Sequence, residues 1–266
     1  MKRIKDGKYY SPDIWAISYL LNEEVSWECT VRTIELDKRL DEIKPTEILR
    51  LYFLPKIFVG FSFLPDVRDK AKEIIGKIKN KEYVTYKHDC SLRKRGTKNK
   101  IESKIEEDLF NNLSLRLQEY FDADGIGMRQ FPANFFNGSI REKDRVGEKF
   151  WIDILSVNKS NQLSVIELKA DRNTPLDLFI QAIDYGIFAY LFRDSIADYP
   201  FINNKKLVKK VSVYLIAEKF HPAIVGDEKI RGVCSCLRNN DFFDIHLIQF
   251  EKEGNKIENS KEIRCV

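Results

Sequence analysis

The 266-residue sequence lacks any long uninterrupted apolar run. Its most apolar stretch, residues 49–64, is interrupted by Arg50, Pro55 and Lys56 and falls short of the roughly 18 apolar residues that a membrane-spanning helix needs. The basic start, MKRIKDGKYYSPD, is followed by no apolar stretch, which argues against a secretory signal. We therefore expect a cytoplasmic protein with no membrane partner.

Zinc-ligand patterns and phosphate-binding loops are missing as well. The five cysteines and three histidines are scattered, and Cys234 and Cys236 are closer together than zinc ligands usually are. No glycine precedes a Gly-Lys-Ser/Thr sequence at the spacing of a phosphate-binding loop. These absences weigh against zinc enzymes and NTPases. We expect reduced thiols rather than disulfides, with Cys234 and Cys236 as small thiols in a C-terminal helix.

The charge is nearly balanced overall but unevenly distributed. Lys and Arg number 45 against 41 Asp and Glu, and the net charge of +4 identifies no partner by itself. Between Lys77 and Lys104, ten basic residues against three acidic ones give +7, which leaves −3 for the other residues. This stretch is either a solvated linker or a loop that contacts phosphates, and the sequence leaves both open. Its candidate nucleic-acid-binding residues are Arg93, Lys94, Arg95, Lys98 and Lys100.

The sequence changes character near residue 99, which predicts two regions. Residues 1–98 form a smaller α+β region that ends in the basic stretch, and we expect it to recognise DNA or to mediate dimerisation. Within it, residues 14–21 and 67–78 show helical spacing, whereas residues 25–31 alternate as in a strand. Residues 99–266 form the larger domain.

The larger domain shows a regular order of expected elements. Apolar residues recur at helical spacing over residues 101–117, and a second helix is expected at residues 177–192. Apolar runs predict strands at residues 128–136, 150–157, 163–170, 211–217 and 242–250. A helix, successive strands, a helix and further strands describe the α/β class, with a mixed sheet flanked by helices.

Three charged residues interrupt two of these apolar strands. Asp153 lies within FWIDIL, and Glu167 and Lys169 lie within SVIELKA. Because side chains alternate along a strand, Glu167 and Lys169 share a face about 7 Å apart, and a hairpin would bring Asp153 beside them. Two carboxylates and a lysine suit Mg²⁺ or Mn²⁺, and charges rarely enter such strands unless they are paired or bind a metal. The alternative is a salt bridge on a solvated strand.

The two helices supply further candidates. Gln181 and Tyr185 are four residues apart, so they share a face of a helix that we expect to pack over the strand ends. Ordinary helix packing with a hydrogen-bonded phenol is the other interpretation of this pair. Glu106 lies toward the apolar side of the first helix and is a candidate third carboxylate, with Glu102 and Glu107 as competitors.

These residues resemble the PD-(D/E)XK nuclease superfamily, which has the restriction-endonuclease-like fold. Asp153, followed fourteen residues later by Glu167-Leu168-Lys169, is similar to the Asp…Glu-x-Lys signature, although Ile152 stands where the family name has proline. Gln181-Ala-Ile-Asp-Tyr185 is similar to the Gln-xxx-Tyr motif of RecB-like members. The text WIDIL…VIELKA…QAIDY looks most like the C-terminal nuclease domain of the NucS (EndoMS) group. The resemblance covers roughly residues 100–218.

The resemblance implies a Mg²⁺-dependent nuclease, with Mn²⁺ as a substitute metal. Its partner would be nucleic acid, DNA first, in a repair, phage or restriction context, and a homodimer would suit cleavage of both strands. The alternative is a non-catalytic nucleic-acid-binding or assembly protein that retains the fold. The resemblance assigns metal binding to Asp153, Glu167, Glu106 and the Leu168 carbonyl, and catalysis to the three carboxylates with Lys169, Gln181 and Tyr185.

Overall fold

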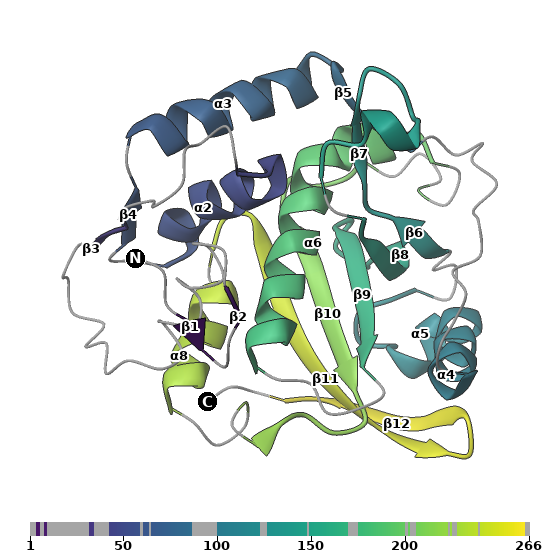
Figure 1. The fold of residues 1–266 in the computed structure, drawn as a ribbon. Helices are drawn as coiled ribbons and strands as arrows, with labels where there is room; N and C mark the ends of the chain where they lie inside the picture. The colour runs from purple at the N-terminus through teal and green to yellow at the C-terminus, as the bar shows by residue number, and fades with distance from the viewer. Residues whose placement is uncertain are drawn as a thin grey trace.

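A computed structural model describes most of the chain from residue 43 onward (Figure 1). The described residues are 4–5, 8–9, 32–34, 43–58, 61–63, 65–86, 100–122, 127–147, 149–169, 175–199, 202, 206–222, 224, 228–238 and 240–263. The helix expected at residues 14–21 and the strand expected at residues 25–31 lie outside them. The same is true of four predicted nucleic-acid-binding residues, Arg93, Lys94, Arg95 and Lys98.

A six-stranded mixed sheet forms the centre of the structure. Its strands are Met128–Pro132 (β6), Trp151–Val157 (β8), Leu163–Lys169 (β9), Val211–Ala217 (β10), Phe243–Glu253 (β11) and Lys256–Glu262 (β12). They are arranged in the order β12-β11-β10-β9-β8-β6. The strands β9, β10 and β11 are parallel, whereas β6, β8 and β9 form antiparallel pairs and β12 returns antiparallel to β11.

Helices cover both faces of this sheet, which confirms the expected α/β class. The helices Pro175–Ile196 (α6) and Glu228–Arg238 (α8) pack on one face, and Lys100–Asn111 (α4) and Leu113–Arg116 (α5) pack on the other. The helices Pro45–Ile57 (α2) and Pro65–Lys79 (α3) join the apolar core on the α6 side, where both contact α6. The helix α6 contacts β9, β10 and β11, and in Figure 1 it lies in front of β11 and beside β10. Across the described ranges, no helix combines the length and the hydropathy that crossing a membrane requires.

Shorter elements lie outside the main sheet. Three two-stranded pairs form, β1 with β2, β3 with β4, and β5 with β7. Their bounds are Ile4–Lys5 (β1), Lys8–Tyr9 (β2), Arg32–Ile34 (β3), Phe61–Phe63 (β4), Tyr83–Thr85 (β5) and Phe135–Asn137 (β7), and a 3₁₀ turn spans Glu142–Asp144 (η2).

The burial of the central strand β10 explains its continuous apolar sequence. All seven of its residues are buried, because Val213 and Leu215 face the core under α6 while Tyr214 and Ile216 face the core under α4. A parallel strand that is covered on both faces reads as a continuous apolar run. The strand expected at residues 211–217 is therefore confirmed.

The predicted helix over residues 101–117 is wrong as a single element, because it breaks at Asn112. The backbone of Asn112 leaves the helical region (φ −125°, ψ 28°), and its side-chain Nδ2 donates to the Asp108 carbonyl at 3.0 Å and to the Asp108 carboxylate at 3.1 Å. Asparagine side chains compete in this way with the helical hydrogen bonds of the backbone. Two helices, α4 and α5, result.

The predicted strand over residues 128–136 is also wrong as a single element. It divides after Pro132, which has no amide to continue a ladder. Asn134 then fixes the bend, since its Oδ1 accepts a hydrogen bond from the Phe150 amide at 3.0 Å. The following strand β7 pairs with β5 instead of the main sheet.

Other elements were placed well or missed altogether. The strands β8 and β9 and the helices α3 and α6 confirm the expectations for residues 150–157, 163–170, 67–78 and 177–192. Within α8, Cys234 is buried, as expected, and Cys236 is half-buried, and neither of the two is in a disulfide. The helix α2 and the last strand β12 were not anticipated, and the hairpin to β12 turns at Gly254 with a φ of +62°.

The helices α2 and α3 of the N-terminal region pack directly on the larger domain. Arg50 of α2 forms two hydrogen bonds with Asp184 of α6, at 2.6 Å from Nε and 2.7 Å from Nη2. Both side chains are buried, with exposed fractions of 4% and 7%. The domain boundary after residue 98 stays a prediction.

Candidate functional site

The strands β8 and β9 part at the residues that the sequence singled out. Their antiparallel ladder runs from the connecting turn to the pair Ile154 and Ile166. Asp153 and Glu167 come next in this register, but here the Asp153 Oδ2 accepts a hydrogen bond from the Leu168 amide at 2.9 Å. A carboxylate thus takes the place of a ladder carbonyl, and it is oriented by the backbone.

Glu167 and Lys169 lie on one face of β9 and are in contact. The Lys169 Nζ lies 2.9 Å from Glu167 Oε1, with side-chain exposed fractions of 18% and 5%. The lysine therefore reaches solvent while the carboxylate is buried. The second oxygen, Glu167 Oε2, is buried and has no hydrogen-bond partner.

Three carboxylates lie close enough to influence one another. Asp153, Glu167 and Glu106 have exposed fractions of only 6%, 4% and 3%. Burial raises the pKa of Asp153 well above its usual value, and the nearby Glu167 and Glu106 carboxylates raise it further. The Leu168 amide and the charge of Lys169 act in the opposite direction. Such a group of buried carboxylates is costly to maintain without a cation.

Glu106 is the buried carboxylate of its helix, whereas Glu107 has an exposed side-chain fraction of 61%. Its two oxygens are held by neighbouring residues of β6: Arg129 Nε lies 2.9 Å from Oε1, and Gln130 Nε2 lies 2.8 Å from Oε2. Among the residues that the structure describes, no group of three or more His, Cys, Asp or Glu side chains is arranged to hold a metal ion. Ligation by Glu106 stays a prediction.

The helix α6 packs over the start of β8, as the sequence suggested. The hydroxyl of buried Tyr185 donates a hydrogen bond to the Trp151 carbonyl at 3.0 Å, two residues before Asp153. Gln181, one turn earlier, has a buried Oε1 that lacks a hydrogen-bond partner. Tyr185 therefore fixes the strand that carries Asp153, and Gln181 retains an unused acceptor.

Unused buried acceptors concentrate in this set of residues. In the described part of the chain, six buried side-chain atoms lack a partner, and two of these are arginine nitrogens and one a threonine hydroxyl. The other three are carbonyl or carboxylate oxygens, which only accept, and they belong to Gln130, Glu167 and Gln181. Hard oxygen donors of this kind are the ligands and water-binding groups that suit Mg²⁺ and Mn²⁺, so the donor chemistry fits such a cation.

Sequence reasoning missed the two residues that hold Glu106. Arg129 and Gln130 are polar residues inside an apolar strand, in the text MRQFP, and that interruption was the available signal. Of the predicted nucleic-acid-binding residues, Lys100 begins α4 and the remaining four lie outside the described residues.

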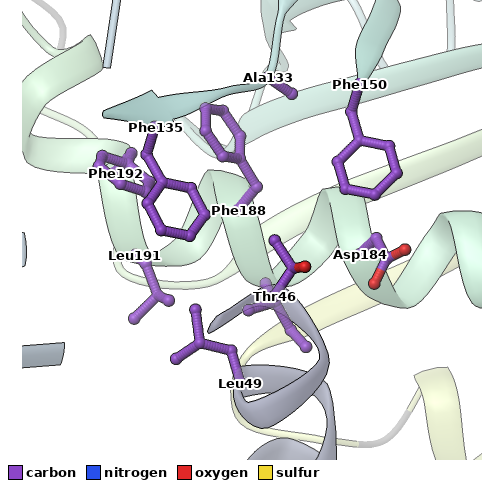
Figure 2. A pocket seen from close by; sticks show the side chains of 10 residues that line it. Thr46, Leu49, Ala133, Phe135, Phe150, Asp184, Phe188, Leu191 and Phe192 are labelled. Carbon is purple, nitrogen blue, oxygen red and sulfur yellow. The ribbon is translucent and has the colours of Figure 1, made fainter. Parts of the chain in front are cut away.

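A pocket lies between α2, α6 and the β6–β7 bend (Figure 2). Its lining is mainly apolar, and its one carboxylate, Asp184, is bound to Arg50. Such a surface does not offer the convergent oxygens that a metal ion requires or the cations that bind phosphate. The lining residues are Thr46, Leu49, Ala133, Phe135, Phe150, Asp184, Ile187, Phe188, Leu191 and Phe192.

Comparisons with known proteins do not assign this chain to a family. No model of a known protein family matches it, and no curated protein matches it either. A functional conclusion therefore depends on the site geometry and on the motif residues themselves.

Proposed function

We propose that the chain is a divalent-metal-dependent nuclease with a restriction-endonuclease-like fold that hydrolyses phosphodiester bonds in DNA. The observation that carries this proposal is the convergence of Asp153, Glu167 and Lys169 where β8 and β9 part. A structural salt bridge with Lys169 needs only one carboxylate, whereas this site buries both Asp153 and Glu167, with Glu106 as a third buried carboxylate nearby. The mixed sheet with helices on both faces is the architecture that the motif resemblance implies.

Asp153 and Glu167 would hold Mg²⁺ or Mn²⁺, with the Leu168 carbonyl and Glu106 as further ligands. When bound, the metal lowers the pKa of a bound water and acts as a Lewis acid at the scissile phosphate. Of the two carboxylates, Asp153 is oriented by the Leu168 amide, and Glu167 keeps one buried oxygen without a hydrogen-bond partner.

Lys169 and the α6 residues would complete the chemistry around these carboxylates. The Lys169 ammonium is partly exposed beside Glu167, so it can orient the attacking water or stabilise negative charge on the phosphate. We assign it this electrostatic role because it forms an ion pair. Tyr185 holds the start of β8 through the Trp151 carbonyl. The unused oxygen of Gln181 can accept a hydrogen bond from water around the phosphate or around the carboxylate ligands.

The biological setting that we propose is DNA repair, phage replication or restriction, in the cytoplasm. A homodimer would place two such sites for cleavage of both strands. The basic stretch before α4 would contact phosphates.

Plasmid cleavage in the presence of Mg²⁺ tests the proposed function. Asp153→Ala and Lys169→Ala are each expected to reduce the cleavage rate at least a hundredfold, because each removes a group from the reacting centre. Lys159→Ala is the matched control, since Lys159 is an exposed lysine in the turn at the opposite end of the same hairpin. Equal cleavage by all four proteins would refute the assignment.

The second candidate is a nucleic-acid-binding or assembly protein that retains the fold without the chemistry. The observation in its favour is that Arg129 and Gln130 engage Glu106, which leaves two carboxylates at the strand ends. Calorimetric titration with Mn²⁺ separates the two candidates, because the nuclease must bind the ion and the binding protein need not.

A further inference from the structure

Gln130 adopts a backbone conformation that is unusual for a strand residue. Its φ of +53° lies in the left-handed region, although it belongs to β6. The neighbouring pairs are Arg129 with Ile154 and Phe131 with Ile152, so Gln130 lies opposite Asp153 across the β6–β8 pair. Strained residues of this kind persist where the surrounding structure holds them, and they concentrate at functional sites.

The side chain of Gln130 has a defined orientation. Its Nε2 lies 2.8 Å from Glu106 Oε2, and an ionised carboxylate only accepts hydrogen bonds, so the amide nitrogen must face Glu106. The amide oxygen then points away from Glu106, and it is buried without a partner. Gln130, the residue opposite Asp153 in the β6–β8 register, therefore binds one carboxylate of the group and keeps an unused buried acceptor.

An unused buried acceptor needs a donor, and the neighbouring charges indicate which kind. The carboxylates of Glu106, Glu167 and Asp153 outnumber the two cations beside them, Arg129 and Lys169, so the group favours a hydrated cation over an anion or an apolar ligand. Water molecules bound to a cation are strong hydrogen-bond donors. Amide oxygens that accept from them orient the ligands of the ion and tune its affinity.

We propose that Gln130 is a further positioning residue of this site: its amide nitrogen holds Glu106, and its amide oxygen accepts a hydrogen bond from a water molecule of a hydrated Mg²⁺ or Mn²⁺ ion. This inference rests on the proposed function, because it requires the carboxylates of Asp153 and Glu167 to bind that ion. The left-handed backbone is the means by which β6 directs the glutamine toward the group.

Two variants separate this role from a structural one. Gln130→Gly removes the side chain and suits the left-handed backbone, which offsets the loss of the hydrogen bond to buried Glu106, so the metal-free protein should stay folded with a melting temperature close to that of its parent. Gln130→Asn keeps a side-chain amide but shortens the side chain by one methylene, and asparagine tolerates the left-handed backbone. Asn161→Gly is the matched control, because Asn161 is also left-handed (φ 58°) and is exposed in the β8–β9 turn.

The measurement is the dissociation constant of Mn²⁺ alone, followed by electron paramagnetic resonance, together with the melting temperature. Loss of such a supporting contact typically weakens metal affinity by about 10- to 100-fold. We expect at least tenfold weaker binding for both Gln130 variants and an unchanged constant for Asn161→Gly. Unchanged Mn²⁺ affinity in folded Gln130 variants would overturn the role of Gln130 while leaving the nuclease proposal intact. Absence of Mn²⁺ binding and of cleavage by the unsubstituted protein would overturn both.

Discussion

The backbone amide of Leu168 donates a hydrogen bond to the carboxylate of Asp153, at 2.9 Å, just beyond the last paired residues of β8 and β9. The carboxylate is therefore oriented by a peptide group whose position is fixed by the sheet. Lys169 contacts the other carboxylate, Glu167, and also reaches solvent. Because Asp153 is bound by a backbone amide and Glu167 by a lysine, both acidic side chains can occupy neighbouring buried positions.

Asp153→Asn should stabilise the metal-free protein and abolish its response to metal. The neutral amide removes repulsion with Glu167 and Glu106, while its oxygen can still accept from the Leu168 amide. We expect a gain of about 1–2 kcal/mol in the free energy of unfolding, measured by urea denaturation with a chelator present. Mn²⁺ should raise the melting temperature of the unsubstituted protein only. A variant that is less stable than its parent in the absence of metal would contradict the electrostatic repulsion that we assign to these three carboxylates.

Removing one partner of the Arg50–Asp184 pair should be strongly destabilising. Arg50→Ala leaves the Asp184 carboxylate buried without its arginine, and removing one partner of a buried ion pair costs about 3–5 kcal/mol. Chemical denaturation of the variant measures this loss. The double variant Arg50→Met, Asp184→Leu is the control, because it removes both charges and should recover much of the stability. If the single variant loses no more than an exposed substitution, then the pair does not join α2 to α6 as described.

Glu262 makes the stability of the folded protein depend on pH in the acid range. Its carboxylate contacts His246 Nδ1 at 3.2 Å, the Tyr120 hydroxyl at 2.7 Å and Arg238 Nη2 at 3.0 Å. The hydrogen bond with His246, followed by that with Tyr120, lowers its pKa from 4.5 to about 2, although burial opposes the shift. Because the pKa in the folded state is depressed, this stabilisation is complete above pH 4.5 and is lost as the pH falls toward 2.

Glu262→Gln should therefore cost about 1–2 kcal/mol at neutral pH and progressively less in acid, after allowance for a carboxylate that is partly exposed. Urea denaturation at several pH values gives this difference directly. Glu258→Gln is the control, since Glu258 is exposed on the same strand and should show no such dependence. A difference that stays constant down to acid pH would show that the contacts do not depend on the charge of Glu262.

Neutralising the basic stretch tests whether it contacts phosphates. Replacing Arg93, Lys94 and Arg95 with glutamine should reduce the slope of log binding constant against log salt concentration by about 3, if each side chain neutralises one phosphate. Fluorescence anisotropy with labelled duplex DNA measures the slope. An unchanged slope would assign the stretch the role of a plain linker.

Strands with continuous apolar sequence could be predicted from the sequence, because burial on both faces leaves a local signature. Val211 to Ala217 is the clearest example. The break at Asn112 depended instead on whether one side chain turned back to its own helix, which composition does not reveal. The hairpin to β12 was missed because its residues are largely exposed and carry little apolar pattern.

The site shows the same contrast between local and distant signals. Asp153, Glu167 and Lys169 were identified because charges stand out in apolar strands, and alternation placed Glu167 beside Lys169. The orientation of Glu106 could not be predicted, because it depends on two residues more than twenty positions away. The left-handed backbone of Gln130 likewise reflects the packing of β6 rather than any local preference of glutamine.

The most direct test of the nuclease account is a cleavage panel of labelled single-stranded, duplex, flap and mismatched DNA, with Mg²⁺ or with a chelator. The account predicts metal-dependent cleavage of at least one substrate by the unsubstituted protein and none by Asp153→Ala. Failure of the folded protein to cut any of the four substrates with Mg²⁺ or Mn²⁺, or equal cleavage by Asp153→Ala, would contradict it.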